Sequence, residues 1–116
     1  MASPIDPTLA KNLIKEFRDQ NKASGENALK TPDGQYLHGF FIERQTMEKI
    51  LADKDNAGMH VYLAKHPNFA GQGDKVHTAL VTGSKPNTEP GAATSYVSDG
   101  EICETPICPP ICTTIK

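Results

Sequence analysis

The chain has 116 residues, of which 37% are hydrophobic and 22% charged, and it contains no tryptophan. A chain of this length buries roughly two-thirds of its unfolded surface, which allows one modest core and disfavours a second. Its formal charge of −2, without a cluster of Lys and Arg, disfavours nucleic acid and anionic membrane surfaces as partners. Charged residues from Asp6 to Glu16 interrupt the apolar residues near the N-terminus, so neither a signal peptide nor a membrane span is predicted and a cytoplasmic location is expected.

Two segments near the start of the chain have the periodicity of amphipathic helices. The first is expected over residues 7–21, because Asp6 and Pro7 are typical of an N-cap and a first helical turn and apolar residues follow at helical spacing. The second is expected over residues 45–53, where apolar residues again recur at this spacing.

Three segments have the character of strands: residues 36–42, 59–65 and 76–82. The last two are expected to form an antiparallel hairpin around a long loop. The element order α-β-α-β-β predicts an α+β domain over residues 4–83, with a three-stranded mixed sheet of order 1-3-2, order 1-2-3 being the alternative, and with both helices on one face. The predicted core consists of Leu9, Leu13, Ile14, Phe17, Phe41, Ile50, Leu51, Val61, Leu63, Leu80 and Val81.

The composition changes near residue 84, and residues 84–116 are predicted to form an extended tail. They hold all three cysteines and five of the nine prolines, and Tyr96 is their only aromatic residue. Such a segment cannot bury enough apolar surface to offset an ordering entropy of about 1–2 kcal/mol per residue. We therefore expect the tail to become ordered only by packing on the domain or on another chain.

The sequence contains no recognisable pattern of a catalytic or cofactor-binding site. His38, His60, His66 and His77 lie on or beside the predicted strands, but their spacing matches no metal-binding motif. The glycines of the hairpin loop are not followed by a helix, so they do not form a dinucleotide-binding loop. No carboxylate pair or Gly-x-Ser-x-Gly turn is present. A protein without catalytic activity or cofactor is predicted.

The cysteine spacing of the tail fits neither a zinc knuckle nor an iron–sulfur site. Along a polyproline path through Pro109 and Pro110, Cys108 and Cys112 would lie about 12 Å apart, beyond the limit of ~7 Å for a disulfide. This pair is therefore not expected to form a disulfide unless the peptide bond of Pro110 is cis. A disulfide from Cys103 to either residue, a bridge between chains, and three free thiols all stay open.

Three interpretations of the tail follow, and the favoured one is an arm whose isoleucines dock on the uncovered sheet face or on a neighbouring subunit. It predicts a protein-binding or self-assembling module that forms a homo-oligomer. Residues 101–115 are expected to be held mainly by side-chain burial, because the prolines have no backbone N–H to donate to a neighbouring strand. The expected binding residues are Phe69, Ile102, Ile107, Ile111 and Ile115.

The first alternative is a thiol-based metal or redox site with Cys103, Cys108, Cys112 and His77. The second is a precursor of a modified peptide, with residues 84–116 as its core. Its candidate dehydration sites are Thr94, Ser95, Ser98, Thr105 and Thr113.

Overall fold

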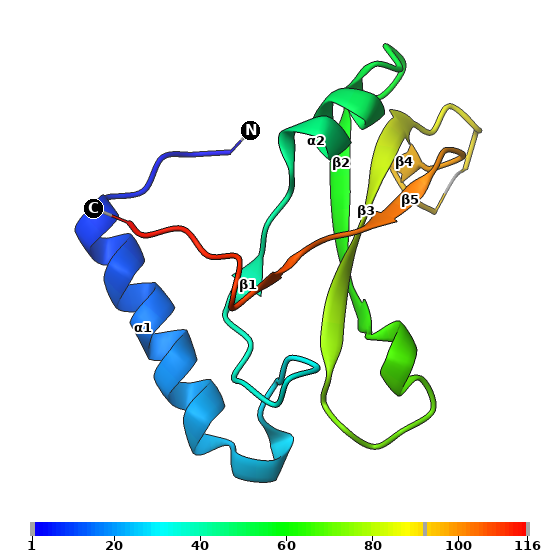
Figure 1. Cartoon of the computed structure of the whole chain (residues 1–116). Helices are drawn as coiled ribbons and strands as arrows, with labels where there is room; N and C mark the ends of the chain where they lie inside the picture. Colours follow the sequence, from blue (N-terminus) through cyan, green and yellow to red (C-terminus); the bar gives the residue numbers. More distant parts are fainter. Residues whose placement is uncertain (1, 92, 116) are drawn as a thin grey trace.

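The computed structural model describes residues 2–91 and 93–115 and shows a small α+β fold with antiparallel sheets (Figure 1). Its elements in chain order are α1 (Pro7–Ala23), η1 (Gly25–Asn27), β1 (Gly39–Phe40), α2 (Arg44–Leu51), β2 (Gly58–Lys65), η2 (Pro67–Phe69), β3 (His77–Pro86), β4 (Tyr96–Val97), β5 (Ile102–Glu104) and β6 (Ile107–Cys108). Both predicted helices are present, and each begins within a residue of its expected start.

Helix α1 starts and ends for local reasons that the sequence shows. The Asp6 carboxylate accepts a hydrogen bond from the Leu9 amide at 3.1 Å, and Pro7 occupies the first turn. Gly25, two residues after the helix, adopts a φ of 56°, which a residue without a Cβ tolerates. The far end of the helix is anchored by the buried Asn21, whose side-chain amide exchanges hydrogen bonds of 2.7 and 3.0 Å with the backbone of Leu29.

The predicted hairpin is confirmed. Strands β2 and β3 pair antiparallel over eight residues, from Gly58 opposite Ser84 to Lys65 opposite His77. The connecting loop contains η2 and is closed by the Lys65 ammonium, which donates to the carbonyls of Gln72 and Asp74.

The predicted sheet, mixed and of order 1-3-2, is wrong in both strand order and direction. Strand β3 is central, pairing with β2 on one side and with β4 and β5 on the other, and every named strand pair is antiparallel. The strand expected over 36–42 is only Gly39–Phe40, and it pairs with β6 in a separate sheet. Its aromatic and β-branched residues indicate extended backbone, but they do not specify a partner some 70 residues away.

The core is smaller than predicted and centres on β3. Val81 and Ala79 of this strand are fully buried, and Ile50 of α2 is 7% exposed. Ile14 and Leu80 are half-buried. The remaining predicted core residues are 40–73% exposed, which corrects their assignment: Leu9, Leu13, Phe17, Phe41, Leu51, Val61 and Leu63.

For Leu9, Leu13 and Phe17, the physical reason for this correction is the position of α1. The helix stands beside the C-terminal segment and away from the β2–β3 hairpin, so the expectation that both helices cover one sheet face is wrong (Figure 1). Its apolar stripe thus has no sheet to pack on. In the described part of the chain, neither helix has the length and apolar character needed to cross a membrane.

Candidate functional site

The tail is held mainly by backbone pairing, so the expectation that isoleucine burial dominates is wrong. Ile102, Ile111 and Ile115 are 61%, 46% and 40% exposed, and Ile107 is half-buried. Instead, β5 pairs with β3 and β6 pairs with β1, so the tail adds strands to sheet edges. Pro106, which has no N–H, takes part through its carbonyl, which accepts from the Phe41 amide at 2.9 Å.

Thr105, between β5 and β6, joins the tail to the edge of β3. It is 5% exposed, and both its amide and its hydroxyl donate to the carbonyl of Ala79, at 3.1 and 3.3 Å. Thr105, one of the candidate dehydration sites, is therefore buried and hydrogen-bonded within the fold.

The other expected contact residue, Phe69, lies in η2 at the hairpin loop. It is half-buried, and its ring packs edge-on against His66 with the ring centroids 5.7 Å apart. The structure therefore places Phe69 apart from the isoleucines of the tail.

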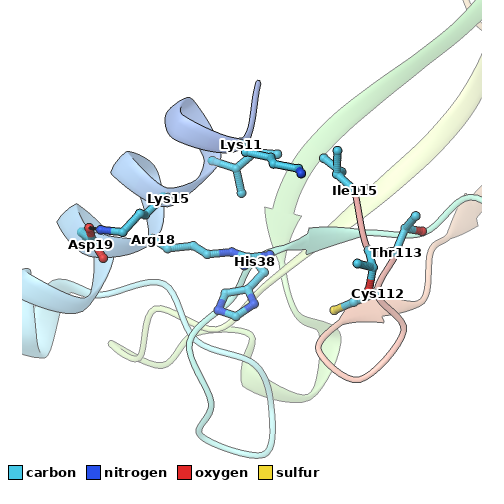
Figure 2. A pocket seen from close by; sticks show the side chains of 10 residues that line it. Lys11, Lys15, Arg18, Asp19, His38, Cys112, Thr113 and Ile115 are labelled. Carbon is cyan, nitrogen blue, oxygen red and sulfur yellow. Dashed lines mark hydrogen bonds and ion pairs between the residues drawn. The ribbon is translucent and has the colours of Figure 1, made fainter. Parts of the chain in front are cut away.

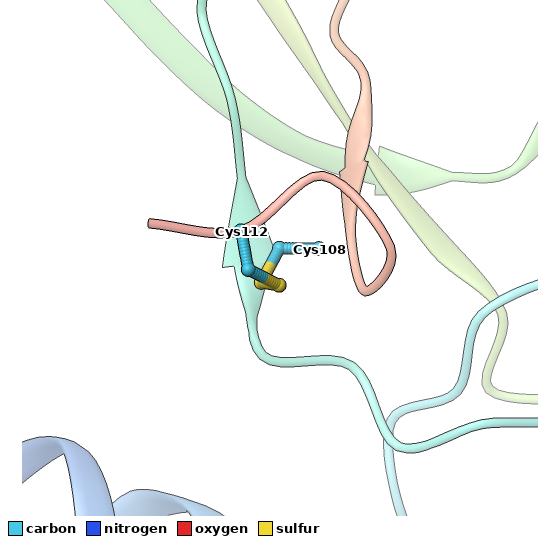
Figure 3. Close-up of a disulfide and its surroundings, with 2 residues drawn as sticks. All are labelled: Cys108 and Cys112. Carbon is cyan, nitrogen blue, oxygen red and sulfur yellow. A yellow bond between two sulfur atoms is a disulfide. The ribbon is translucent and has the colours of Figure 1, made fainter. Parts of the chain in front are cut away.

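Cys108 and Cys112 form a disulfide, the pairing that was expected only if the peptide bond of Pro110 is cis (Figure 3). The Cα atoms of the two cysteines are 4.9 Å apart, because the Cys108–Pro109 and Pro109–Pro110 peptide bonds are both cis and the chain reverses direction. The Ile111 amide, which donates to the carbonyl of Ile107 at 3.1 Å, closes the turn.

The third cysteine and His77 do not join this pair. Cys103 is free and lies on β5 opposite Val81, whereas His77 is at the start of β3, four residues before Val81. At about 3.3 Å per residue, His77 and Cys103 are separated by roughly 13 Å along the sheet.

His38 occupies the place that the sequence suggested for His77. A ring nitrogen of His38 and the sulfur atoms of Cys108 and Cys112 lie within 4.8 Å of one another. The main chain fixes this arrangement, because the His38 amide donates to the carbonyl of Cys108 at 2.9 Å, next to the β1–β6 pair. The sequence predicts a strand that includes His38, but none of its features indicates that His38 lies beside Cys108.

A pocket of about 520 Å³ opens beside this group, between α1 and the C-terminal residues (Figure 2). Lys11, Lys15 and Arg18 of α1 line one side, and His38 and Cys112 line the other. Lys15 forms an ion pair with Asp19 at 2.6 Å, whereas no ion pair among the described residues involves Lys11 or Arg18.

The electrostatic environment of His38 favours a neutral imidazole. Partial desolvation lowers the pKa of His38 below its ordinary value of 6.5, and the positive charge of Arg18 lowers it further. At neutral pH one ring nitrogen is therefore free to accept a proton.

A second candidate surface is the outer edge of β2, which pairs only with β3 among the described strands. Its four central residues, 60–63, are exposed, and they project alternately to the two faces of the sheet. The rings of His60 and Tyr62 stack on one face with centroids 4.2 Å apart. Val61 and Leu63, on the other face, are 45% and 73% exposed.

No family model, curated protein or solved structure matches the chain. Its function is therefore inferred from the geometry of its own residues.

Proposed function

We propose that the protein is a self-association module in which two copies pair through the free edges of their β2 strands. The observation that carries this proposal is the eight-residue edge of β2, which is exposed on both faces at its centre. In an edge strand, alternate residues direct their amide and carbonyl groups outward, where another strand can accept and donate the missing ladder bonds.

The sequence of β2 lacks the features that protect sheet edges from pairing. Residues 58–64 contain neither proline nor a charged side chain, and Lys65 is the only charged residue of the strand. Proline, lysine and bulges are the usual means of blocking such edges. By contrast, β4 and β5 are two and three residues long, too short to form a comparable edge.

A second copy is favoured as the partner because β2 is compatible with pairing to itself. The backbone bonds to β3 leave the N–H and C=O groups of Met59, Val61 and Leu63 pointing outward, so in an antiparallel pair centred on Val61 each Val61 faces its counterpart in the opposite copy and Met59 faces Leu63. Lys65 of each copy then lies opposite Ala57, so the two lysines are at opposite ends of the interface and do not repel each other.

The exposed surface supports the same proposal. The chain exposes 8516 Å², whereas a compact monomer of 12.6 kDa is expected to expose roughly 6200 Å². Its radius of gyration is 16.4 Å, against about 13 Å for a compact domain of this length. A stable interface needs about 800 Å² from each partner, which the excess of roughly 2300 Å² can supply.

The test is the concentration dependence of the molecular mass, measured by sedimentation equilibrium on the full chain and on Val61→Lys. The full chain is expected to reach twice the monomer mass of 12.6 kDa. Val61→Lys places a lysine from each copy at the centre of the interface, so its dissociation constant should rise at least about tenfold. Leu13→Lys is the matched control, because Leu13 is 47% exposed on α1, outside the proposed interface.

Hydrogen exchange identifies the contact surface. The outward amides of β2 are expected to exchange more slowly as the concentration of the full chain rises, and those of Val61→Lys should not. A chain that stays monomeric at about 100 µM, or an association that Leu13→Lys abolishes and Val61→Lys preserves, would contradict the proposal; the second result would assign the interface to α1.

A further inference from the structure

The two sulfur atoms of the disulfide differ in their accessibility. Cys108 is 9% exposed and lies in β6, whereas Cys112 is exposed and lines the pocket beside α1. A thiolate attacks a disulfide at the sulfur it can reach, and the other sulfur departs as a thiolate. A small thiol entering the pocket would therefore reach Cys112 and release Cys108.

The charge of the pocket selects the kind of thiol. Asp19 neutralises Lys15, so Lys11 and Arg18 give this side of the pocket a net positive charge. Figure 2 shows Arg18 extending from α1 toward His38, and Lys11 extending toward Ile115. A guanidinium binds a carboxylate through two parallel hydrogen bonds, which suits a thiol that carries a carboxylate group.

His38 is placed to transfer the proton. One of its ring nitrogens lies within 4.8 Å of both sulfurs, and the hydrogen bond between its amide and the Cys108 carbonyl fixes its position. A neutral imidazole can take the proton of the entering thiol and return it to the thiolate that leaves.

We propose that the Cys108–Cys112 disulfide is an exchange site that accepts a small anionic thiol as a mixed disulfide on Cys112. The thiol sulfur forms a bond with Sγ of Cys112 while the Cys108–Cys112 bond breaks, and the proton of the thiol ends on Sγ of Cys108 through His38. The entering sulfur is oxidised and Cys108 is reduced, so the exchange needs no other oxidant or reductant. This inference uses residues outside β2 and is independent of the proposed self-association.

The experiment compares three thiols on the oxidised full chain with Cys103→Ser, which removes the free cysteine. The probes are 3-mercaptopropionate, 2-mercaptoethanol and cysteamine, which are anionic, neutral and cationic. Acid-quenched samples are analysed by intact mass for the adduct and by peptide mapping for its position. Each rate per thiolate is divided by the rate of the same thiol with a small uncharged disulfide, which removes differences in intrinsic nucleophilicity. The corrected rates are expected to fall in the order given, by about tenfold from first to last at low salt, with the adduct on Cys112.

Variants assign the roles of the pocket residues. Arg18→Gln and Lys11→Gln together should remove the preference for the anionic probe, whereas Lys22→Gln, on the same helix but outside the pocket, should preserve it. His38→Asn should slow all three probes several-fold without changing their order, because it removes proton transfer and keeps the charges.

Three results would overturn the proposal. The first is an equal corrected rate for the three probes, and the second is an adduct on Cys108. The third is a chain that, as purified, carries one zinc ion bound by His38, Cys108 and Cys112, since the disulfide would then not be the resting state.

Discussion

Gly83 of β3 allows α2 to pack against the sheet, and replacing it with alanine should break a specific contact. A Cβ atom at Gly83 would lie 2.6 Å from Cγ and 2.7 Å from Oδ1 of Asn56, closer than carbon atoms approach such groups in folded proteins. Asn56 cannot move freely, because its side-chain amide donates to the Ile50 carbonyl at 2.8 Å near the end of α2. Gly83 itself has an ordinary strand backbone, so alanine adds a steric conflict without backbone strain.

The cost of Gly83→Ala follows from these contacts. Displacing Asn56 loses a hydrogen bond worth about 1 kcal/mol, and the added methyl group in a filled space costs about 1–3 kcal/mol. Alanine recovers about 0.5–1 kcal/mol relative to glycine within a strand. We therefore expect a net loss of about 1–3 kcal/mol. In an Asn56→Ala background the space is empty, and the same change should be neutral or slightly stabilising.

A double-mutant cycle measures this coupling. Urea unfolding of the original chain, the two single variants and the double variant should give a coupling free energy of about 1–3 kcal/mol with similar m-values. Gly58→Ala is the matched control, since none of the described atoms beyond its chain neighbours comes within 4 Å of a Cβ built there. Additivity within about 0.5 kcal/mol would refute the reasoning, because the two sites would then not share the space.

Three further predictions concern the core, the charges and the tail. Val81→Ala removes two fully buried methyl groups and should lower the free energy of unfolding by about 2–3 kcal/mol, whereas Leu13→Ala, at a half-exposed position, should cost under about 1 kcal/mol in the same urea assay. The Asp55 amide, which donates a hydrogen bond to the Asp53 carboxylate, lowers the pKa of Asp53 in the folded state below its ordinary value of 3.8. The stability that this carboxylate contributes is therefore complete above pH 3.8 and is lost as the pH falls through the lower pKa of the folded state. Asp53→Asn should flatten this part of the pH profile of the urea midpoint. A chain ending at Gly100 lacks β5 and β6 and should lose its cooperative thermal transition, measured by circular dichroism.

The features that could be predicted from the sequence are those that neighbouring residues determine. Asp6 and Pro7 mark the start of α1 because the cap bonds an amide three residues away. The β2–β3 hairpin was predictable because alternating residues on both sides of a glycine-rich loop pair with each other. In both cases the interacting groups are close along the chain.

The features that could not be predicted depend on distant partners. Nothing in residues 36–42 indicates that β1 pairs with the tail, and the spacing of Leu9, Leu13 and Phe17 shows an apolar stripe without showing what it faces. The disulfide could be predicted only conditionally, because it needs a cis bond at Pro110 and the sequence does not reveal the isomer of a prolyl bond. His38 lies near the sulfur atoms only because β6 pairs with β1 and the disulfide loop reverses the chain, and the sequence predicts neither feature.

The tail also explains why the proposed association would stop at a dimer. A sheet with two long free edges can add copies indefinitely, whereas a sheet with one can pair only once. Here β5 and β4 occupy the side of β3 opposite β2, and their own outer edges are only three and two residues long. Because the tail fills this side within the same chain, pairing through β2 uses the last long edge of the described sheet and leaves no comparable edge for a third copy.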